Sequence, residues 1–135
     1  MMALKGSCLC GGIRYEVDGL DGPISHCHCH TCRKAHASAF ATTAGVERHH
    51  FRWTAGEDRV RSYESSPGKQ RHFCPACGTH LVAERAGQSR LILRVATLDD
   101  DPAARPSFHI WTSHDVPWLA REDEAPHYEE WQPGR

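Results

Sequence analysis

Short stretches in which apolar and polar residues alternate dominate the chain, and this period of two predicts β-strands. The clearest stretch covers residues 91–97, where Leu91, Leu93 and Val95 fall on one face. Further strands are expected over residues 12–17, 38–43, 51–53, 58–64, 70–73, 79–83 and 108–110. Helical spacing is limited to a turn or two after Cys32. The pattern therefore predicts an all-β domain, a small sandwich or barrel-like assembly of sheets.

Length and charge narrow the class of protein. The 135 residues predict one domain over 1–135, with a polar tail from about residue 121. The 16 Lys and Arg residues against 17 Asp and Glu are not the balance of a nucleic-acid binder, which is normally basic. No apolar run is long enough to cross a bilayer, and the first residues lack the apolar segment of a secretory signal. We expect a cytoplasmic protein with small-molecule partners and no nucleic-acid or membrane partner; its oligomeric state stays open.

The 7 cysteines are the most informative feature, because all of them fall into short clusters. The clusters are Cys8 with Cys10, then Cys27 with Cys29 and Cys32, then Cys74 with Cys77. An odd number of cysteines cannot all pair in disulfides, and a cytoplasmic location disfavours disulfides in any case. The clustering therefore indicates metal binding or catalysis.

The first and last clusters together predict a closed zinc site. Two tight turns that each present two sulfurs can face one another and surround zinc tetrahedrally. Glycines follow the thiols directly, at 11, 12 and 78, where the backbone has to fold back. We therefore expect a structural zinc on a four-cysteine cluster; the alternative is a chance pairing of unrelated motifs. Its ligands are Cys8, Cys10, Cys74 and Cys77.

The middle cluster has only three cysteines, and three protein ligands with a free fourth position are typical of a reactive zinc. This three-cysteine cluster consists of Cys27, Cys29 and Cys32. Two alternatives remain: three free thiols, or closure by an imidazole of His26, His28 or His30. The open site is favoured because a residue between two ligands usually points its side chain away.

Three thiolates around zinc favour thiol chemistry. They leave the metal a weak Lewis acid, and soft sulfur surroundings prefer a soft fourth ligand, such as the thiolate of glutathione. Cations are needed nearby to offset the negative charge. Arg33 and Lys34 follow Cys32 directly and are candidates for contacts with the thiol substrate or its carboxylate, although a solvated surface explains them as well.

Three ordered motifs carry a resemblance to a known family. They are Gly6-Ser7-Cys8-Leu9-Cys10-Gly11-Gly12-Ile13-Arg14-Tyr15, Cys27-His28-Cys29-His30-Thr31-Cys32-Arg33-Lys34 and Phe73-Cys74-Pro75-Ala76-Cys77-Gly78-Thr79. The sequence resembles the glutathione-dependent formaldehyde-activating enzyme family, in which centromere protein V is also grouped. The resemblance implies a β-tent fold of packed antiparallel sheets with two zinc ions, structural on the four-cysteine cluster and catalytic on the three-cysteine cluster. The family often has glycine where this chain has Ala37.

The reaction expected from the resemblance is the addition of glutathione, or a similar thiol, to formaldehyde or a related small carbonyl compound. The product would be S-hydroxymethylglutathione, and the reverse reaction is that of a carbon–sulfur lyase. A general acid must protonate the carbinol oxygen, and histidine suits neutral pH. The candidates are His30, His36 and His109. The aromatic candidates for lining the pocket, or for packing in the core, are Phe40, Trp111 and Trp118.

Two other functions stay open from the sequence. The first is a zinc-stabilised scaffold without catalysis, which a fourth protein ligand on the second zinc would favour. The second is a nucleic-acid-binding zinc ribbon, against which stand the acidic balance and the lack of a basic stripe with interleaved aromatic residues. The local basic runs at 59–61 and 69–72 are expected to be solvated strand faces.

Overall fold

Ten short strands and one α-helix make up the described part of the chain, residues 2–119 and 124–134 of a computed structural model. The strands are β1 (Leu4–Ser7), β2 (Arg14–Val17), β3 (Ile24–Cys27), β4 (Ala41–Glu47), β5 (Phe51–Ala55), β6 (Arg61–Ser66), β7 (Lys69–Phe73), β8 (His80–Arg85), β9 (Arg90–Arg94) and β10 (Pro106–Ile110), and the helix is α1 (His30–His36). Single 3-10 turns cover Arg48–His50, Glu57–Arg59, Val95–Thr97, Thr112–His114 and Pro117–Leu119. None of the helices described is long and apolar enough to cross a membrane.

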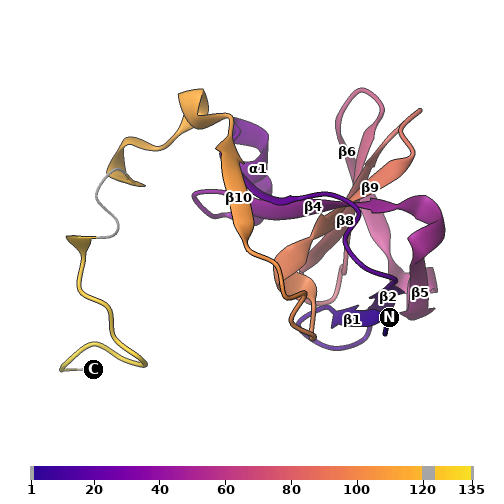
Figure 1. Cartoon of the computed structure of the whole chain (residues 1–135), viewed down its shortest axis with the longest axis horizontal. Coiled ribbons are helices and arrows are strands. Elements are labelled where there is room, and N and C mark those ends of the chain that lie inside the picture. Colours follow the sequence, from indigo (N-terminus) through magenta and orange to yellow (C-terminus); the bar gives the residue numbers. More distant parts are fainter. Residues whose placement is uncertain (1, 120–123, 135) are drawn as a thin grey trace.

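The strands form two sheets, so the all-β prediction is confirmed. A three-stranded sheet has the order β1-β2-β5, and a seven-stranded sheet has the order β10-β3-β4-β9-β8-β7-β6 (Figure 1). Strand pairs in the described residues are antiparallel with one exception, β10 beside β3, which is parallel. The fully antiparallel arrangement implied by the resemblance is wrong at this pair. β10 reaches the sheet edge through a long connection after β9, and such a connection permits parallel pairing.

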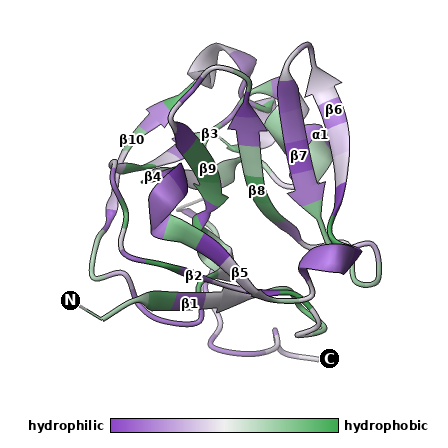
Figure 2. Ribbon diagram, turned by 90° about the vertical axis from the view of Figure 1, so that its right-hand side faces the viewer, coloured by the Kyte–Doolittle hydropathy of each residue, from purple (hydrophilic) through white to green (hydrophobic). Residues whose placement is uncertain are grey.

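The main core forms around apolar residues of β2, β8 and β9. Ile13 precedes β2 and is fully buried, as are Tyr15 and Val17 within it, so the alternation predicted there is confirmed. Leu93 of β9 is also buried, and β8 and β9 show this apolar character in Figure 2. Val95 is the exception, because the chain leaves β9 for a 3-10 turn at that residue. Burial of each such side chain contributes roughly 1.5–3 kcal/mol.

Some boundaries differ from the sequence prediction. The strand expected over 38–43 begins at Ala41 and continues to Glu47, with Gly45 inside it instead of closing it. A side chain at Gly45 would meet Arg90 of β9 at 3.1 Å, so the glycine permits close strand packing. The tail expected from about 121 begins within 120–123, outside the described residues, and residues 124–134 contain no strand.

Candidate metal centres

The four-cysteine cluster has the geometry of a tetrahedral metal site. Its sulfur atoms all lie within 4.8 Å of one another. The Sγ atom of Cys10 lies 3.6 Å from that of Cys8 and 3.9 Å from that of Cys74. Zinc–sulfur bonds of about 2.3 Å place the sulfurs of a tetrahedral site roughly 3.8 Å apart. The donor set therefore fits zinc.

Two left-handed glycines and one threonine shape the turns around these sulfurs. Gly11 has φ +77° and Gly78 has φ +80°, a conformation that glycine adopts without a steric penalty. The Thr79 hydroxyl accepts a hydrogen bond from the Leu9 backbone N–H at 3.0 Å and lies 3.3 Å from the sulfur of Cys77. Hydrogen bonding from Thr79 lowers the pKa of Cys77 to about 5. This side chain thus joins the two turns and favours the thiolate that a metal requires.

The four-cysteine cluster lies between the two sheets. Cys8 and Cys10 occupy the turn between β1 and β2 of the three-stranded sheet. Cys74 and Cys77 occupy the turn between β7 and β8 of the seven-stranded sheet. A metal ion on all four sulfurs would therefore tie the sheets together, as a structural site does.

The three-cysteine cluster lies where β3 passes into α1. Cys27 is the last residue of β3, Cys29 is the N-cap of α1 and Cys32 lies in its first turn. The sulfur of Cys29 accepts a hydrogen bond from the backbone N–H of Cys32 at 3.3 Å. Capping by a side chain two or three residues before the bonded N–H is common at helix starts. The C-x-x-C spacing thus starts the helix and also gathers the sulfurs, which lie within 4.8 Å of one another.

The neighbouring histidines engage other partners. The Nδ1 atom of His26 lies 2.9 Å from the Thr42 hydroxyl. His28 is buried, with its Nδ1 atom 2.5 Å from the Asp115 carboxylate and its Nε2 atom 2.8 Å from Nδ1 of His109. In the described residues, no histidine, carboxylate or further cysteine has a ligand atom within 4.8 Å of all three sulfurs. Within the described residues, no imidazole therefore completes a four-ligand set with these sulfurs.

A group of buried cations lies beside the three-cysteine cluster, and the sequence did not reveal it. Lys69 is 8%, Arg71 2% and Arg94 5% exposed. Nη2 of Arg71 lies 3.8 Å from the sulfur of Cys32. The expectation of a solvated face at 69–72 is therefore wrong for Lys69 and Arg71, which share the inner face of β7. Figure 2 shows β7 as mainly hydrophilic, so the hydropathy of this strand gives no sign that one of its faces is buried.

These cations and thiols shift one another's ionisation. Hydrogen bonding from Cys27, the largest influence, together with Cys29 and Arg71, lowers the pKa of Cys32 to about 4 against the effect of burial. Burial lowers the pKa of Arg94 to about 10, while the nearby thiolates of the three-cysteine cluster oppose that shift. Burial also lowers the pKa of Lys69, with Arg71 adding to the effect. The surroundings therefore favour the thiolate of Cys32, whereas hydrogen bonding to Cys32 and burial raise the pKa of Cys27.

Arg33 and Lys34 occupy α1 as expected, Arg33 half-buried and Lys34 exposed. Lys34 lines an open cavity of about 420 Å³ that Arg71 also lines. The cavity thus connects one of the substrate-contact candidates to the buried cations.

The remaining sequence candidates divide between the site and the surface. His36 packs against His80 with ring centres 4.9 Å apart, and burial lowers its pKa to about 3. The ring of Phe40 lies 4.2 Å from that of His26 and 5.0 Å from that of His28, centre to centre, so it packs against the site. His30 is exposed, as are the tryptophans, Trp111 and Trp118.

A groove of about 510 Å³ adjoins the His28 side of the three-cysteine cluster. It is lined by His28, His109, Thr112, Asp115, Val116, Pro117 and Leu119. Asp115 was missed in the sequence because it lies 87 residues after His28, and only the parallel pairing of β10 with β3 brings the segments together.

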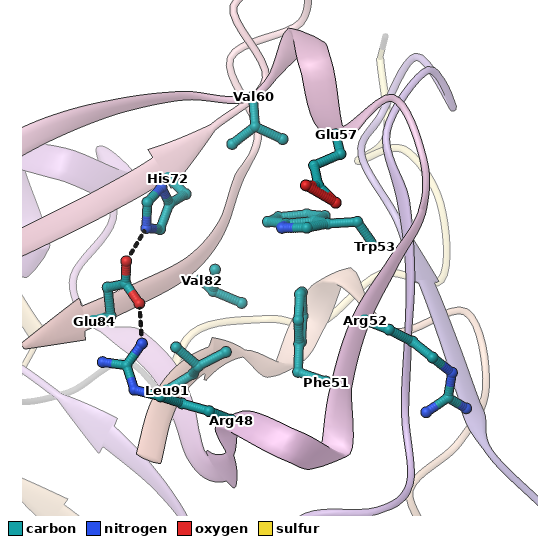
Figure 3. A pocket seen from close by; sticks show the side chains of 10 residues that line it. All are labelled: Arg48, Phe51, Arg52, Trp53, Glu57, Val60, His72, Val82, Glu84 and Leu91. Carbon is teal, nitrogen blue, oxygen red and sulfur yellow. Dashed lines mark hydrogen bonds and ion pairs between the residues drawn. The ribbon is translucent and has the colours of Figure 1, made fainter. Parts of the chain in front are cut away.

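Another cavity, of about 520 Å³, contains no cysteine (Figure 3). Phe51, Trp53 and other apolar side chains form its walls. Three of its polar residues pair with one another, since the Glu84 carboxylate contacts both Arg48 and His72. This pocket lacks a nucleophile or a set of metal ligands, so the candidate chemistry is at the cysteines.

Comparison with known families and proteins finds the same family that the three cysteine motifs indicate. A family model described as "Glutathione-dependent formaldehyde-activating enzyme" matches residues 3–114. A protein of Halomonas elongata, provisionally named such an enzyme, is 28% identical over 131 residues, which cover 90% of this chain and 82% of the relative.

An uncharacterized lyase of Schizosaccharomyces pombe is 32% identical over 81 residues, which cover 60% of this chain. The chain spans little more than half, 57%, of that relative. The crystal structure of a Rhodobacter sphaeroides protein superposes with a TM-score of 0.63 and 26% identity, over 72% of this chain and 89% of that one.

Proposed function

The chain belongs to the glutathione-dependent formaldehyde-activating enzyme family, and on that premise we propose that it is a lyase-type enzyme of carbon–sulfur bonds. Its reaction joins the sulfur of glutathione, or of a related thiol, to formaldehyde or a similar small carbonyl compound. The reverse reaction breaks the same bond. The names of the Halomonas and fission yeast relatives support this class.

The observation that carries the proposal is the three-cysteine cluster, three sulfurs within 4.8 Å of one another and bordered by buried cations. Cys27, Cys29 and Cys32 would hold the catalytic zinc, and the four-cysteine cluster would hold the structural zinc. A zinc ion held by these three ligands would lower the pKa of a thiol in the fourth position and so supply the substrate sulfur in its thiolate form.

His109 is the residue that we assign to proton transfer. Its Nδ1 atom is engaged by His28, which the Asp115 carboxylate contacts on the opposite ring nitrogen. Protonated His109 then gives its Nε2 proton to the carbonyl oxygen as the carbon–sulfur bond forms, which leaves a hydroxyl group on the product and a neutral imidazole that takes up a proton from solvent. In the reverse direction the same nitrogen takes that proton back. His36 is less suited, because burial keeps it uncharged.

Arg33 and Lys34 are the proposed contacts for a carboxylate of the thiol substrate. Both follow Cys32 on α1, and Lys34 lines the cavity shared with Arg71. A guanidinium or ammonium group binds a carboxylate through charge-assisted hydrogen bonds.

Replacing one ligand tests the proposal. Cys29→Ser is expected to lose one of two zinc ions and to slow S-hydroxymethylglutathione formation, followed by NMR, by about 100-fold or more. Ser38→Ala, at an exposed position just after α1, is the control and should keep both zinc ions and the rate. An unchanged rate in Cys29→Ser after loss of a zinc ion would instead support a non-catalytic scaffold.

A further inference from the structure

Three cations beside the three-cysteine cluster are buried, and none of them has a carboxylate partner among the described residues. Lys69, Arg71 and Arg94 are all less than one-tenth exposed. The ion pairs of the described residues involve other cations, on the surface and around Glu84. Nη1 of Arg71, and Nε and Nη2 of Arg94, are buried and have no hydrogen-bond partner in the described residues. Buried guanidinium groups normally require a compensating anion.

The negative groups placed to compensate them are the cysteine sulfurs. Arg71 contacts the sulfur of Cys32 at 3.8 Å through Nη2, while its Nε donates to the Ser65 hydroxyl at 2.8 Å. Arg94 ends β9, next to β4, which carries Ala41 in contact with Cys27 and Cys32. The cations thus face the thiolates from the β7 and β9 side of the large sheet.

The charge of the metal-loaded three-cysteine cluster does not balance the charge of the buried cations beside it. Three thiolates with a divalent ion carry a net charge of −1, whereas two guanidinium groups and one ammonium group carry +3. The loaded site would therefore keep an excess of buried positive charge. A neutral fourth ligand leaves that excess in place, and an anionic ligand reduces it.

We propose that Arg71 and Arg94 make the three-cysteine site selective for an anionic fourth ligand, a thiolate, over neutral donors such as imidazole. The proposal rests on the proposed function, because it assumes a metal on these three sulfurs. A thiol binds with release of its proton to solvent, and the two arginines stabilise the charge that remains on sulfur. They are specificity-determining positions that act through charge and need not touch the substrate.

Two consequences separate this selection from carboxylate recognition. A small thiol without a carboxylate, 2-mercaptoethanol, depends on the arginines as glutathione does. Imidazole, which is neutral, does not. Recognition of the carboxylates by Arg33 and Lys34 would instead distinguish glutathione from 2-mercaptoethanol.

The test uses the protein loaded with Co²⁺, whose visible absorption reports the ligands. Glutathione, 2-mercaptoethanol and imidazole are each titrated into the wild type and three variants. Arg94→Met is expected to lower the affinity for both thiols by about tenfold or more. Its affinity for imidazole should be unchanged or higher. Arg94→Lys should recover most of the thiol affinity. Arg90→Met is the matched control at the exposed start of β9, where Arg90 pairs with Glu47, and should behave as the wild type.

Arg71→Met provides a second variant should Arg94→Met fail to fold. The proposal would be overturned if thiols and imidazole lost affinity equally, or if neither Arg94→Met nor Arg71→Met lost affinity for thiols. Either result would leave the proposed function intact. A wild type that binds thiols selectively but forms no S-hydroxymethyl product would overturn the proposed function and leave this inference standing. A wild type that binds no thiol would overturn both.

Discussion

The two cysteine clusters use the same ligand atom in opposite surroundings. The four-cysteine cluster sits in two turns, where Cys10 is exposed and Cys77 half-buried, and hydrogen bonds from backbone and Thr79 surround the sulfurs. The three-cysteine cluster sits at a strand–helix junction beside buried cations. A closed set of four thiolates needs only local hydrogen bonds. Three thiolates placed beside an excess of positive charge favour the binding of a fourth, anionic ligand.

The largest expected effect is on thermal stability, which should respond very differently to the loss of one ligand in each cluster. Cys74→Ser should abolish cooperative thermal unfolding or lower the midpoint drastically, because structural zinc contributes roughly 10–16 kcal/mol in small peptides, as much as a domain's whole stability. Cys29→Ser should unfold cooperatively near the wild-type temperature. Calorimetry together with zinc content makes the comparison, and equal destabilisation of the two variants would show that the clusters do not differ in this way.

Asp115→Asn tests the contacts of His28 and His109 beside the three-cysteine cluster without changing a cysteine ligand. The carboxylate contacts His28 at 2.5 Å, and His28 in turn holds His109. We expect both zinc ions to be retained and the rate to fall by about tenfold, as is common for residues that orient a site. Steady-state kinetics and metal analysis check this; a full wild-type rate would remove His109 from the proton-transfer role.

Ala37→Gly tests the end of the helix that carries Cys32. Ala37 is the C-cap of α1 with φ +49°, a left-handed conformation that strains a residue with a β-carbon. Glycine, which the family often has here, should raise the free energy of unfolding by about 1 kcal/mol and leave the activity unchanged. Chemical denaturation measures the gain, and a destabilised variant would show that the conformation is not strained.

Arg48→Ala gives the smallest expected effect and tests whether the pocket of Figure 3 matters. Arg48 contacts Glu84 with its side chain 44% exposed, and such pairs contribute about 1 kcal/mol or less. Zinc content and rate should equal those of the wild type. A rate loss comparable with that of Asp115→Asn would place the substrate in this pocket instead of beside the three-cysteine cluster.

Local sequence signals predicted much of the fold and both groups of ligands. The strands expected from the sequence overlap β2, β4, β5, β6, β7, β8, β9 and β10, and cysteine spacing grouped the sulfurs as the structure does. β1 and β3 were not predicted, because each has only four residues and lacks a clear alternating pattern.

The charged surroundings of the site could not be predicted in the same way. Lys69 and Arg71 alternate on β7, which placed them on one face, but nothing local shows that this face is inward. Arg94 follows an apolar strand, and its burial depends on β4 beside it. The contact of Asp115 with His28 depends on the pairing of β10 with β3, a long-range event.

The most direct test of the central claim is X-ray absorption at the zinc edge, with and without glutathione. A chain with one closed and one open site should show about 3.5 sulfur ligands per zinc, rising to about four when glutathione is added, with no nitrogen ligand at any stage. An imidazole ligand in the free protein, or a sulfur count that glutathione leaves unchanged, would contradict the claim that the three-cysteine cluster keeps a position for a thiol.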